Sequence, residues 1–539
     1  MDYYSGLYDS LERVKASRTR RKAQQIPKLT LEEKQSLLED YHPDYRLSGF
    51  REIPLGQNKG EMAPRELVEL LEAPSRLKGI PLDLAHPHHQ LDLLVIGGGG
   101  GGSAAALMAR DEGAKVLMAT KLRHGDSNTI MAEGGIGAAT RPDDSPAIHY
   151  VDTIRGGRFA NVPELVRALV TDAPRVVAWL ERLGVLFDRV EEGNILTHTP
   201  AGHSRPRSHS CRDMTGLEIM RVLQDEMRNA QIPVLEFSPV VELLTDPTGA
   251  CAGAVLLNLD TRRHVIVHAK KTILATGGIG RLHIQGFPTT NHYGATADGL
   301  VVAYRAGARL LYVDSIQYHP TGVVWPEQML GLLISEHLRA KGAQLVDREG
   351  ERFINELETR DAISSAIIRA CTAQGRGVPT PGGRQGNWLD TPLIDLLHGR
   401  GTIERQFTGI HHRFRKFGID VTQMPILIYP AQHYQNGGVA IDAWSATTIP
   451  NLYAVGEVAG GVHGRNRLGS NSLVDILVFG RRAGHHAAET LKPEWPAHAT
   501  LDHLQAYHAE LDRLGLDHQI ASPLLLPDYG PADRVEAVR

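Results

Sequence analysis

The chain has 539 residues, of which 42% are hydrophobic and 22% are charged, with a formal net charge of −4. This length allows several domains and a large buried core. The nearly balanced charge gives no reason to expect a nucleic acid or an anionic membrane as partner. No apolar run reaches the length of a membrane-spanning helix, so we expect no direct membrane insertion.

The cysteines and the first residues bear on metal content and compartment. Cys211, Cys251 and Cys371 lack the spacing of an iron–sulfur or zinc site, so no metal site is predicted. The first 25 residues include Arg20 and Arg21 but no apolar stretch, so this arginine pair is not interpreted as an export signal. We expect a cytoplasmic protein that reaches the inner face of the membrane only through partner subunits.

Residues 1–90 differ from the rest of the chain and predict an N-terminal helical extension. LTLEEKQSLLEDY begins with a capping box, in which Thr30 is the N-cap and Glu33 follows three residues later. Pro64 marks the start of another predicted helix. The periodic apolar residues favour an extension packed on the main body or on a partner over a disordered tail.

Residues 91–308 predict the first part of a dinucleotide-binding domain. LDLLVIGGGGGGSAAALMARDEGAKVLMATK predicts a buried strand, a glycine turn, a small-residue helix and a second strand. Gly97, Gly99 and Gly102 give the GxGxxG spacing that brings a pyrophosphate to a helix N-terminus. The acid that would bind a ribose after the second strand is missing, and Lys121 stands there instead, which disfavours a plain NAD site.

Further strand–glycine junctions decide which dinucleotide is bound. TILATGGIG (272–280) and NLYAVGEVAGG (451–461) end predicted strands in glycines, and GDSNTIMAEGG (125–135) follows the second strand. Together they favour an extended flavin cofactor over ordinary turn glycines. Residues 309–424 mix helix and strand, residues 425–490 return to the strand–glycine pattern, and residues 491–539 predict a short helical tail.

Motifs in the second half of the chain resemble a known family. QYHPTG (317–322), TRDAISSA (359–366), AQHYQNGG (431–438) and GRNRLGSNSL (464–473) resemble the flavoprotein subunits of succinate dehydrogenase and fumarate reductase, whose superfamily includes L-aspartate oxidase. The resemblance covers residues 91–484. It implies an α/β fold with a Rossmann-like FAD-binding domain (91–308 and 425–490), an inserted α+β capping domain (309–424), the N-terminal helical extension (1–90) and a short helical C-terminal tail (491–539). It implies FAD contacts from Gly97, Gly99, Gly102, Lys121, Ser127, Asn128, Glu133, Gly134, Gly135, Asp298, Glu457, Arg467, Ser472 and Leu473.

The same resemblance implies a binding site for a C4 dicarboxylate such as fumarate or succinate. His433 and Arg467 would hold one carboxylate. His319 and Ser335 would hold the other, with Ser335 in the place of the threonine of the family's TEG motif and Glu336 after it. Clamps of this kind orient both ends of a dicarboxylate against a flavin.

Arg360 would be the proton donor or acceptor beside the alkene carbon of the substrate, opposite N5 of the flavin. Because the pKa of arginine is ordinarily above 12, this role needs burial, positive neighbours and a proton relay. The family generally reads TEGxRGEG here, whereas SEHLRAKG keeps Arg339 and has Lys341 at the later glutamate. We expect Lys341 to replace the relay carboxylate or to mark a modified substrate.

Two alternative functions remain, L-aspartate oxidase and an electron-transfer subunit. The short His/Arg-rich stretch 199–216 resembles L-aspartate oxidase, but Pro200 stands where that enzyme has the glutamate that reads the substrate amine, which disfavours the oxidase. A non-catalytic flavin electron-transfer subunit of a larger redox complex is the other alternative. Because the chain has no cluster ligands, electrons would be exchanged with a separate iron–sulfur subunit.

Asn128 bears on how FAD is attached. Many relatives have SHT where this chain has SNT, and that histidine binds FAD covalently. An amide forms no such bond, so we predict non-covalent FAD. In the family, loss of the covalent link goes with a lower flavin potential, which favours fumarate reduction over succinate oxidation.

Overall fold

A mixed sheet of seven strands forms the centre of the molecule. The computed structural model describes residues 3–495, 498–516, 520–527 and 529. The strand order is β8-β4-β3-β11-β10-β9, with β19 beside β11. The strands from β8 to β11 and β19 are parallel, whereas β9 and β10 continue the sheet antiparallel. Their bounds are β3 (His89–Ile96), β4 (Val116–Ala119), β8 (Val234–Leu235), β9 (Val240–Thr245), β10 (Cys251–Leu257), β11 (His264–Leu274) and β19 (Leu452–Ala454).

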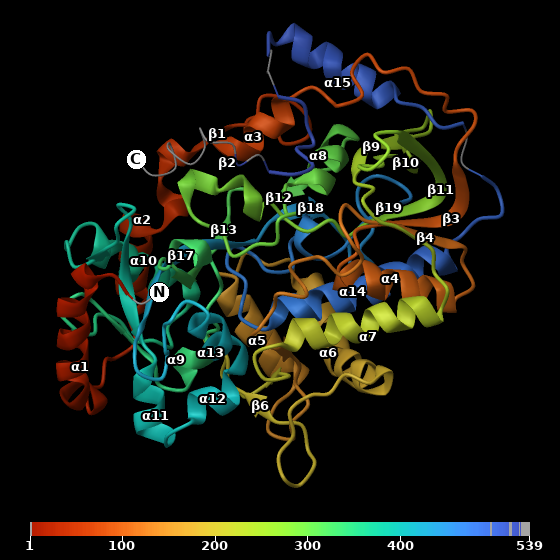
Figure 1. The fold of residues 1–539 in the computed structure, drawn as a ribbon. Helices are drawn as coiled ribbons and strands as arrows, with labels where there is room; N and C mark the ends of the chain where they lie inside the picture. Colours follow the sequence, from red (N-terminus) through yellow and green to blue (C-terminus); the bar gives the residue numbers. More distant parts are fainter. Residues whose placement is uncertain (1–2, 496–497, 517–519, 528, 530–539) are drawn as a thin grey trace.

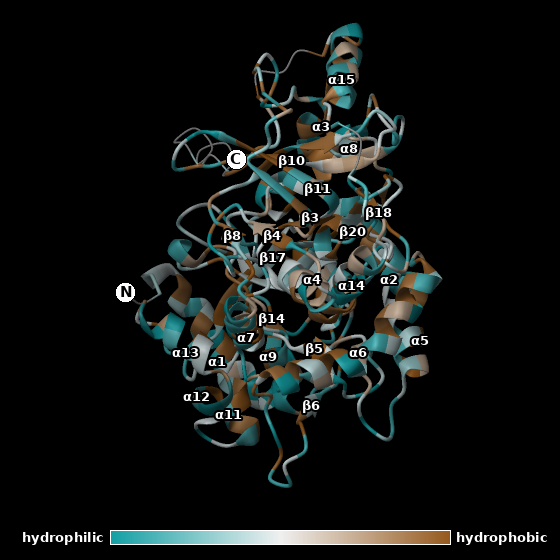
Figure 2. Ribbon diagram, turned by 90° about the vertical axis from the view of Figure 1, so that its right-hand side faces the viewer, coloured by the Kyte–Doolittle hydropathy of each residue, from teal (hydrophilic) through white to brown (hydrophobic). Residues whose placement is uncertain are grey.

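Helices cover one face of this sheet, below it in Figure 1. The glycine turn after β3 leads into α4 (Gly100–Asp111), which packs on α14 (Asn471–Glu489), with α6 (Pro163–Leu183) and α7 (Thr215–Asn229) outside them. The alanines Ala104–Ala106 are fully buried, because small side chains let α4 approach the sheet and α14 closely. Hydrophobic residues gather on the central strands (Figure 2). The predicted strand–turn–helix–strand unit after residue 91 is confirmed.

A second, antiparallel sheet forms a separate lobe, with the order β13-β17-β16-β14 and β15 beside β16. Its strands are β13 (Ile316–Val323), β14 (Gln344–Val346), β15 (Val378–Pro379), β16 (Gln385–Asp390) and β17 (Ile426–Gln435). The helices α10 (Arg360–Cys371), α11 (Pro392–His398), α12 (Thr402–Gln406) and α13 (Thr408–Arg415) belong to the same lobe. Strand β17 lies after residue 424, where the inserted capping domain was predicted to end, but it pairs with β13. The sheet of this lobe therefore also contains residues that follow the predicted domain.

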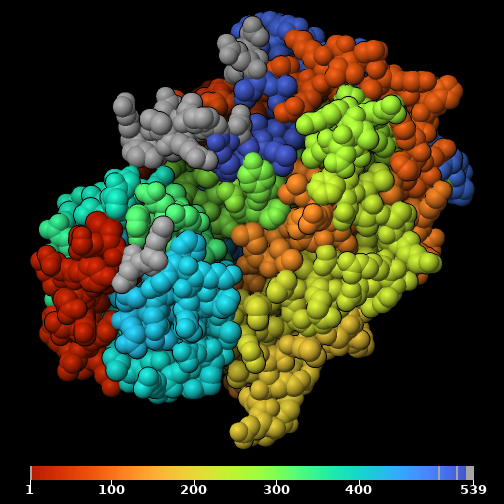
Figure 3. All heavy atoms as spheres, viewed as in Figure 1, coloured from red at the N-terminus to blue at the C-terminus, as the bar shows by residue number. Residues whose placement is uncertain are grey.

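The N-terminal extension lies across both lobes. Helix α1 (Tyr8–Lys22) packs its apolar side on the second sheet, where Arg21 Nη2 pairs with Asp390 Oδ2 at 2.7 Å. Helix α2 (Leu31–Tyr41) begins with the predicted capping box of Thr30 and Glu33, which is confirmed. Helix α3 (Arg65–Glu72) buries its leucines in the core of the central sheet. Figure 3 shows the first residues, in red, against the cyan surface near residue 400.

The C-terminal tail returns to the side of the molecule where α3 lies. Helix α15 (Asp502–Arg513) is held there by the Tyr507 hydroxyl, which donates to the carbonyl of Leu71 at 2.6 Å. Residues 520–527 continue beside residues 74–76 (Figure 1). None of the helices in the described ranges is both long enough and apolar enough to cross a membrane.

Candidate active site

A cavity opens where strands β3, β4 and β11 end, and its first wall is the glycine turn before α4. Gly97 has φ of +122°, and a Cβ atom at this position would lie 2.1 Å from the carbonyl oxygen of Ala275, so only glycine fits. The Gly100 N–H donates to Thr129 Oγ1 at 3.2 Å, which ties the start of α4 to the next wall. The N-terminus of α4 thus faces a cavity suited to a phosphate.

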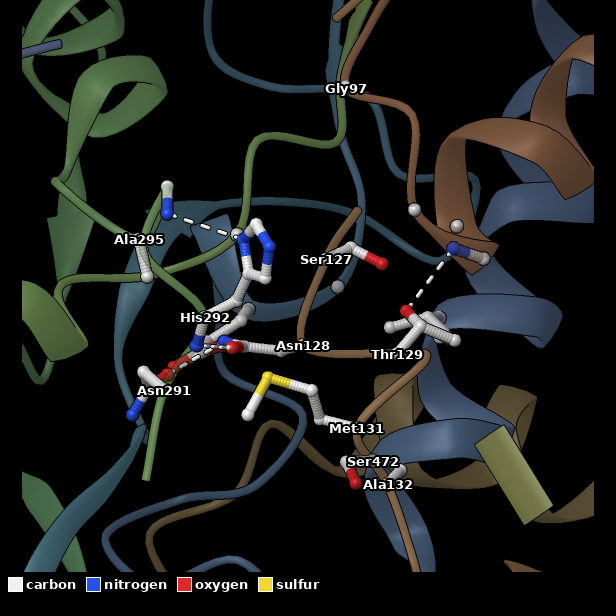
Figure 4. A pocket seen from close by; sticks show the side chains of 18 of the residues that line it. Gly97, Ser127, Asn128, Thr129, Met131, Ala132, Asn291, His292, Ala295 and Ser472 are labelled. Atoms are coloured by element: carbon white, nitrogen blue, oxygen red, sulfur yellow. Dashed lines mark hydrogen bonds between the residues drawn. The ribbon is translucent and has the colours of Figure 1, made fainter. Parts of the chain in front are cut away.

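The second wall is the segment 125–135, where Asn128 connects three parts of the chain. Its Nδ2 donates to Asn291 Oδ1 at 2.6 Å and to Glu457 Oε2 at 3.2 Å. Its Oδ1 accepts from the His292 N–H at 2.6 Å. Figure 4 shows the Asn128 side chain directed toward Asn291 and His292. Both ends of the amide are therefore engaged, and they fix the wall of the cavity in one arrangement.

The acid that the sequence lacks after the second strand is supplied by a distant residue. Lys121 Nζ lies 2.6 Å from Asp298 Oδ2 and 2.6 Å from Thr296 Oγ1, and both Lys121 and Asp298 line the cavity. Asp298 opens helix α8 (Asp298–Arg305). Burial raises the pKa of Asp298 and lowers that of Lys121, while each offsets part of the other's shift. A carboxylate thus stands at the strand end where Rossmann-type folds bind a ribose.

Two buried carboxyl groups face the other parts of the cavity. Burial raises the pKa of Glu133 to about 7 although Arg413 of α13 pairs with it, and its Oε2 atom has no hydrogen-bond partner among the described residues. Burial likewise raises the pKa of Glu457 to about 7, although its carboxylate accepts from the Gln435 N–H at 3.0 Å. Near neutral pH each of these carboxyl groups is partly protonated, so it can either donate a hydrogen bond to the polar edge of a cofactor ring or accept one from it.

The donor set and the shape of the walls fit FAD. A Cβ added at Gly134 would meet no atom within 4 Å, so this glycine leaves its space to the cavity. Gly102 lies outside the lining, and its missing Cβ lets α4 approach Gly97, where an added Cβ would lie 1.9 Å from the carbonyl oxygen. The other residues predicted to contact FAD all line the cavity: Gly97, Gly99, Lys121, Ser127, Asn128, Glu133, Gly134, Gly135, Asp298, Glu457, Arg467, Ser472 and Leu473.

One end of the cavity carries two guanidinium groups, those of Arg360 and Arg467, and His433 lines the same end. Gln317 joins the two arginines: its Oε1 accepts from Arg360 Nη1 at 3.1 Å and from Arg467 Nη2 at 2.9 Å. Its Nε2 donates to the carbonyl of Arg467 at 2.6 Å and to Asn466 Oδ1 at 3.0 Å. All polar atoms of this amide are thus used to hold the guanidinium groups beside each other.

Arg467 is a buried charge whose hydrogen-bond partners are all neutral. Its side chain bonds Gln317, the Ser472 hydroxyl at 3.1 Å and the Leu468 carbonyl at 3.4 Å, and its Nε has no partner among the described residues. Burial, with Arg360 nearby, lowers its pKa to about 9, so the group stays charged at neutral pH. A buried cation that is hydrogen-bonded to no carboxylate makes this end of the cavity an anion site.

Glu336 lies between two arginines next to this anion site. Arg360 Nε donates to Glu336 Oε2 at 3.0 Å, and Arg339 Nη2 lies 3.7 Å from the same oxygen. Burial raises the pKa of Glu336, but Arg360 and Arg339 more than offset this and bring it to about 2. Burial lowers the pKa of Arg339 to about 10. The three side chains form an Arg–Glu–Arg chain that starts at the cavity, with a hydrogen bond between Arg360 and Glu336 and a longer ion pair between Glu336 and Arg339.

Lys341 lies outside this chain, contrary to the expectation that it stands in for the relay carboxylate. Its side chain makes no hydrogen bond or ion pair with any residue that the structure describes. The reason is local: Glu336 is the N-cap of the short helix α9 (His337–Ala340) and lies three residues before Arg339, whereas Lys341 caps the C-terminus of this helix. The carboxylate of the chain is therefore Glu336.

His319 and Ser335 do not line the cavity. The two side chains are almost fully buried, and the His319 ring lies 5.0 Å from that of His433. His433 is held by Thr290, whose Oγ1 is 2.7 Å from Nδ1. Burial, with Arg360 nearby, lowers the pKa of His319 and His433 well below the usual value, so both imidazoles are neutral at neutral pH.

The sequence analysis missed several residues that shape the site. Gln317 opens the motif QYHPTG, so its position was a signal, but nothing local indicated that it joins two arginines. Thr290 and Asn291 lie in a segment without a motif, and only the fold brings them to His433 and Asn128.

Known proteins are similar to this chain in sequence and fold. The chain matches a family described as FAD binding domain over residues 92–473. It is similar to one subunit of the fumarate reductase (CoM/CoB) of Methanothermobacter marburgensis, with 38% identity over 412 residues, 74% of this chain and 73% of that one. An L-aspartate oxidase of Streptomyces coelicolor is 38% identical over 425 residues, 75% and 70% of the two chains. Among solved structures, the FrdA chain of Escherichia coli quinol fumarate reductase has a TM-score of 0.69 and 30% identity, covering 79% of this chain and 74% of that one. The chain therefore belongs to the FAD-binding oxidoreductase family of the fumarate reductase, succinate dehydrogenase and L-aspartate oxidase flavoproteins, and its cofactor is FAD.

Proposed function

We propose that this protein is the flavoprotein subunit of a fumarate reductase or succinate dehydrogenase-type enzyme, and that it reduces fumarate or a close C4 dicarboxylate. The observation that carries the proposal is the anion site at the Arg360 and Arg467 end of the cavity, where a buried cation has only neutral partners. A dicarboxylate supplies the missing negative charge. When bound, FAD supplies the hydride that such a reduction needs.

Different residues around the anion site bind the two carboxylates of the substrate. Arg467 and His433 hold one carboxylate, since the guanidinium is charged and the neutral imidazole of His433 donates one further hydrogen bond. His319, whose ring lies 5.0 Å from that of His433, and Ser335 are buried outside the cavity lining, so they would hold the other carboxylate only after the side chains between them and the cavity move. Binding at both ends fixes the double bond in one orientation, which accounts for a large part of the rate enhancement of oriented reactions.

Arg360 delivers or removes the proton. Its guanidinium lines the cavity and bonds Glu336, and Arg339 follows Glu336. After Arg360 has given its proton to the substrate, Glu336, which lies between Arg360 and Arg339, passes a proton from Arg339 to Arg360. Lys341 has no part in this sequence of transfers.

The electron partner is a separate iron–sulfur protein. Cys211, Cys251 and Cys371 are buried as free thiols in different parts of the fold, and the described residues contain no cluster of metal ligands. Purification of the native complex tests this point, because a cysteine-rich partner should accompany the chain. Its absence under conditions that retain FAD would contradict the proposal that the chain works within such a complex.

L-aspartate oxidase is the second candidate, because a relative with this name is as similar to the chain as the fumarate reductase relative. An α-ammonium group needs an anionic partner, and Pro200 stands at the position that would carry it. Glu336, a nearby carboxylate, is already bonded by Arg360. The geometry therefore favours a substrate with two carboxylates and no ammonium group.

The test measures fumarate-dependent oxidation of reduced viologen by the FAD-loaded protein. We expect turnover by the wild type and a 10²- to 10⁴-fold lower kcat for Arg360→Lys, roughly the contribution of general acid catalysis. Arg141→Lys, at an exposed arginine, is the matched control and should not change kcat. Lack of fumarate turnover by the FAD-loaded wild type would favour the electron carrier, and aspartate-dependent peroxide formation would favour the oxidase.

A further inference from the structure

Residues 74–76 and 522–527, which are far apart in the sequence, meet in a hydrogen-bonded structure that neither the motifs nor the proposed function explains. The Ser522 N–H donates to the Pro74 carbonyl at 2.9 Å, and the Arg76 N–H donates to the Ser522 carbonyl at 3.2 Å. The Arg76 side chain then donates to the carbonyls of Pro523 at 2.5 Å and Leu524 at 3.1 Å. We call residues 74–76 and 522–527 together the terminal clasp.

The terminal clasp is anchored in the core. Ser522 is fully buried, and its hydroxyl donates to the Leu70 carbonyl at 2.7 Å. Arg305 Nη2 donates to the Ser522 carbonyl at 2.9 Å, and Arg305 itself pairs with Glu242 at 2.8 Å. Because these polar groups are buried and satisfied by each other, detaching the tail leaves several of them without partners. The tail therefore has a defined position.

From this anchor the clasp reaches the FAD site. The Leu525 carbonyl oxygen lies 3.2 Å from Thr296 Oγ1. The same hydroxyl oxygen lies 2.6 Å from Lys121 Nζ and 2.8 Å from Asp298 Oδ1. It accepts from Lys121, and its single proton is shared between Asp298 and the Leu525 carbonyl. Leu525 is thus connected through Thr296, by two successive hydrogen bonds, to Lys121 and Asp298, which line this end of the cavity.

The clasp also keeps water from this end of the site. Thr296 and Leu525 are 1% and 5% exposed, and Tyr293 donates to the Pro527 carbonyl at 2.9 Å on the outer side. Loss of the clasp would let water reach the Lys121–Asp298 pair and weaken it, since exposed ion pairs contribute little.

We propose that the terminal clasp closes the Lys121–Asp298 end of the FAD site and slows the release of FAD. The inference rests on FAD as the cofactor, not on the substrate, so it stands or falls independently of the proposed function. Arg76, Ser522 and Leu525 act as positioning residues: they hold Thr296, which holds Lys121 and Asp298. By linkage, bound FAD must stabilise the clasp to the same extent that the clasp stabilises bound FAD.

Two full-length variants test the proposal on the FAD-loaded protein. Arg76→Met removes two donors to the tail, and Thr296→Val removes the hydroxyl that transmits the contact at nearly constant size. Each change removes hydrogen bonds of about 1 kcal/mol, so we expect FAD to dissociate about 5- to 20-fold faster, measured by recovery of free flavin fluorescence after dilution. Tyr507→Phe is the control, because it removes one buried hydroxyl from the tail without touching the clasp.

Hydrogen exchange supplies a second readout that needs no variant. If bound FAD stabilises the clasp, the amides of residues 520–527 should exchange several-fold more slowly with FAD than in the FAD-free protein. Unchanged release rates in the two clasp variants would overturn the proposal. An equal acceleration in Tyr507→Phe, which would indicate general destabilisation, would also overturn it, as would exchange rates that do not depend on FAD.

Discussion

Gln317→Glu places a negative charge between Arg360 and Arg467 while keeping the shape of the side chain. The carboxylate would accept both guanidinium hydrogen bonds that Gln317 Oε1 now accepts, at 3.1 and 2.9 Å. Two unit charges 4 Å apart interact by about 4 kcal/mol at an effective dielectric constant of 20. A substrate carboxylate on the far side of the same arginines is about twice as distant, so the repulsion is about 2 kcal/mol. We therefore expect the KM for fumarate to rise about 30-fold.

The assay for this prediction compares KM and kcat with direct binding of succinate, followed by the absorbance change of bound FAD. Because the introduced carboxylate opposes binding of the substrate in its ground and transition states alike, kcat should fall much less than kcat/KM. Gln317→Met is the matched variant: it adds no charge but releases both arginines, so its larger effect should be on kcat. An unchanged or lower KM in Gln317→Glu, with FAD retained, would refute the idea that Gln317 keeps the arginines free for a carboxylate.

Further predictions concern cofactor attachment, stability and pH. Acid precipitation should release the flavin into the supernatant, because Asn128 stands at the attachment position; flavin that stays in the pellet would contradict this. Asp390→Asn breaks a fully buried pair with Arg21 and should lower the free energy of unfolding by roughly 3–5 kcal/mol in denaturant titrations, whereas Arg13→Met, at an exposed pair, should change it by less than about 1 kcal/mol. The pKa of Glu457 is about 7 in the folded chain against 4.5, so the folded state binds the extra proton and stability falls as pH rises from about 4.5 to 7. Glu457→Gln should lack this fall of roughly 3 kcal/mol, and parallel stability curves for the two proteins would contradict the assignment.

Local chemistry explains which parts of the site the sequence could predict. The turn at Gly97 was predictable because a positive φ and a backbone contact of 2.1 Å exclude any side chain there. The pair of Lys121 and Asp298 was foreseen only as two separate contacts, since 177 residues separate them and no local pattern indicates that they meet. The acid expected after the second strand was therefore present but supplied by another segment.

The proton chain shows the same limit. The motif predicted a role in proton transfer for Lys341. Instead, the three-residue spacing at the start of a short helix brings Glu336 and Arg339 together beside Arg360. Gln317 belonged to a recognised motif, but its role depends on side chains that come from α10 and from the segment before α14. Motifs thus predict which residues matter, and the fold decides which of them touch.

The position of α1 has a consequence for how the chain is made. Arg21 and Asp390 are separated by 369 residues, so this ion pair of helix α1 cannot form until strand β16, which carries Asp390, has left the ribosome. At about 5–20 residues per second, that wait lasts roughly 20–70 seconds. During this time the apolar side of α1, with Leu11 and Val14, lacks the complete surface on which it packs. Helix α1 is therefore synthesised well before its native contacts can be completed, and chaperones have this interval in which to bind it.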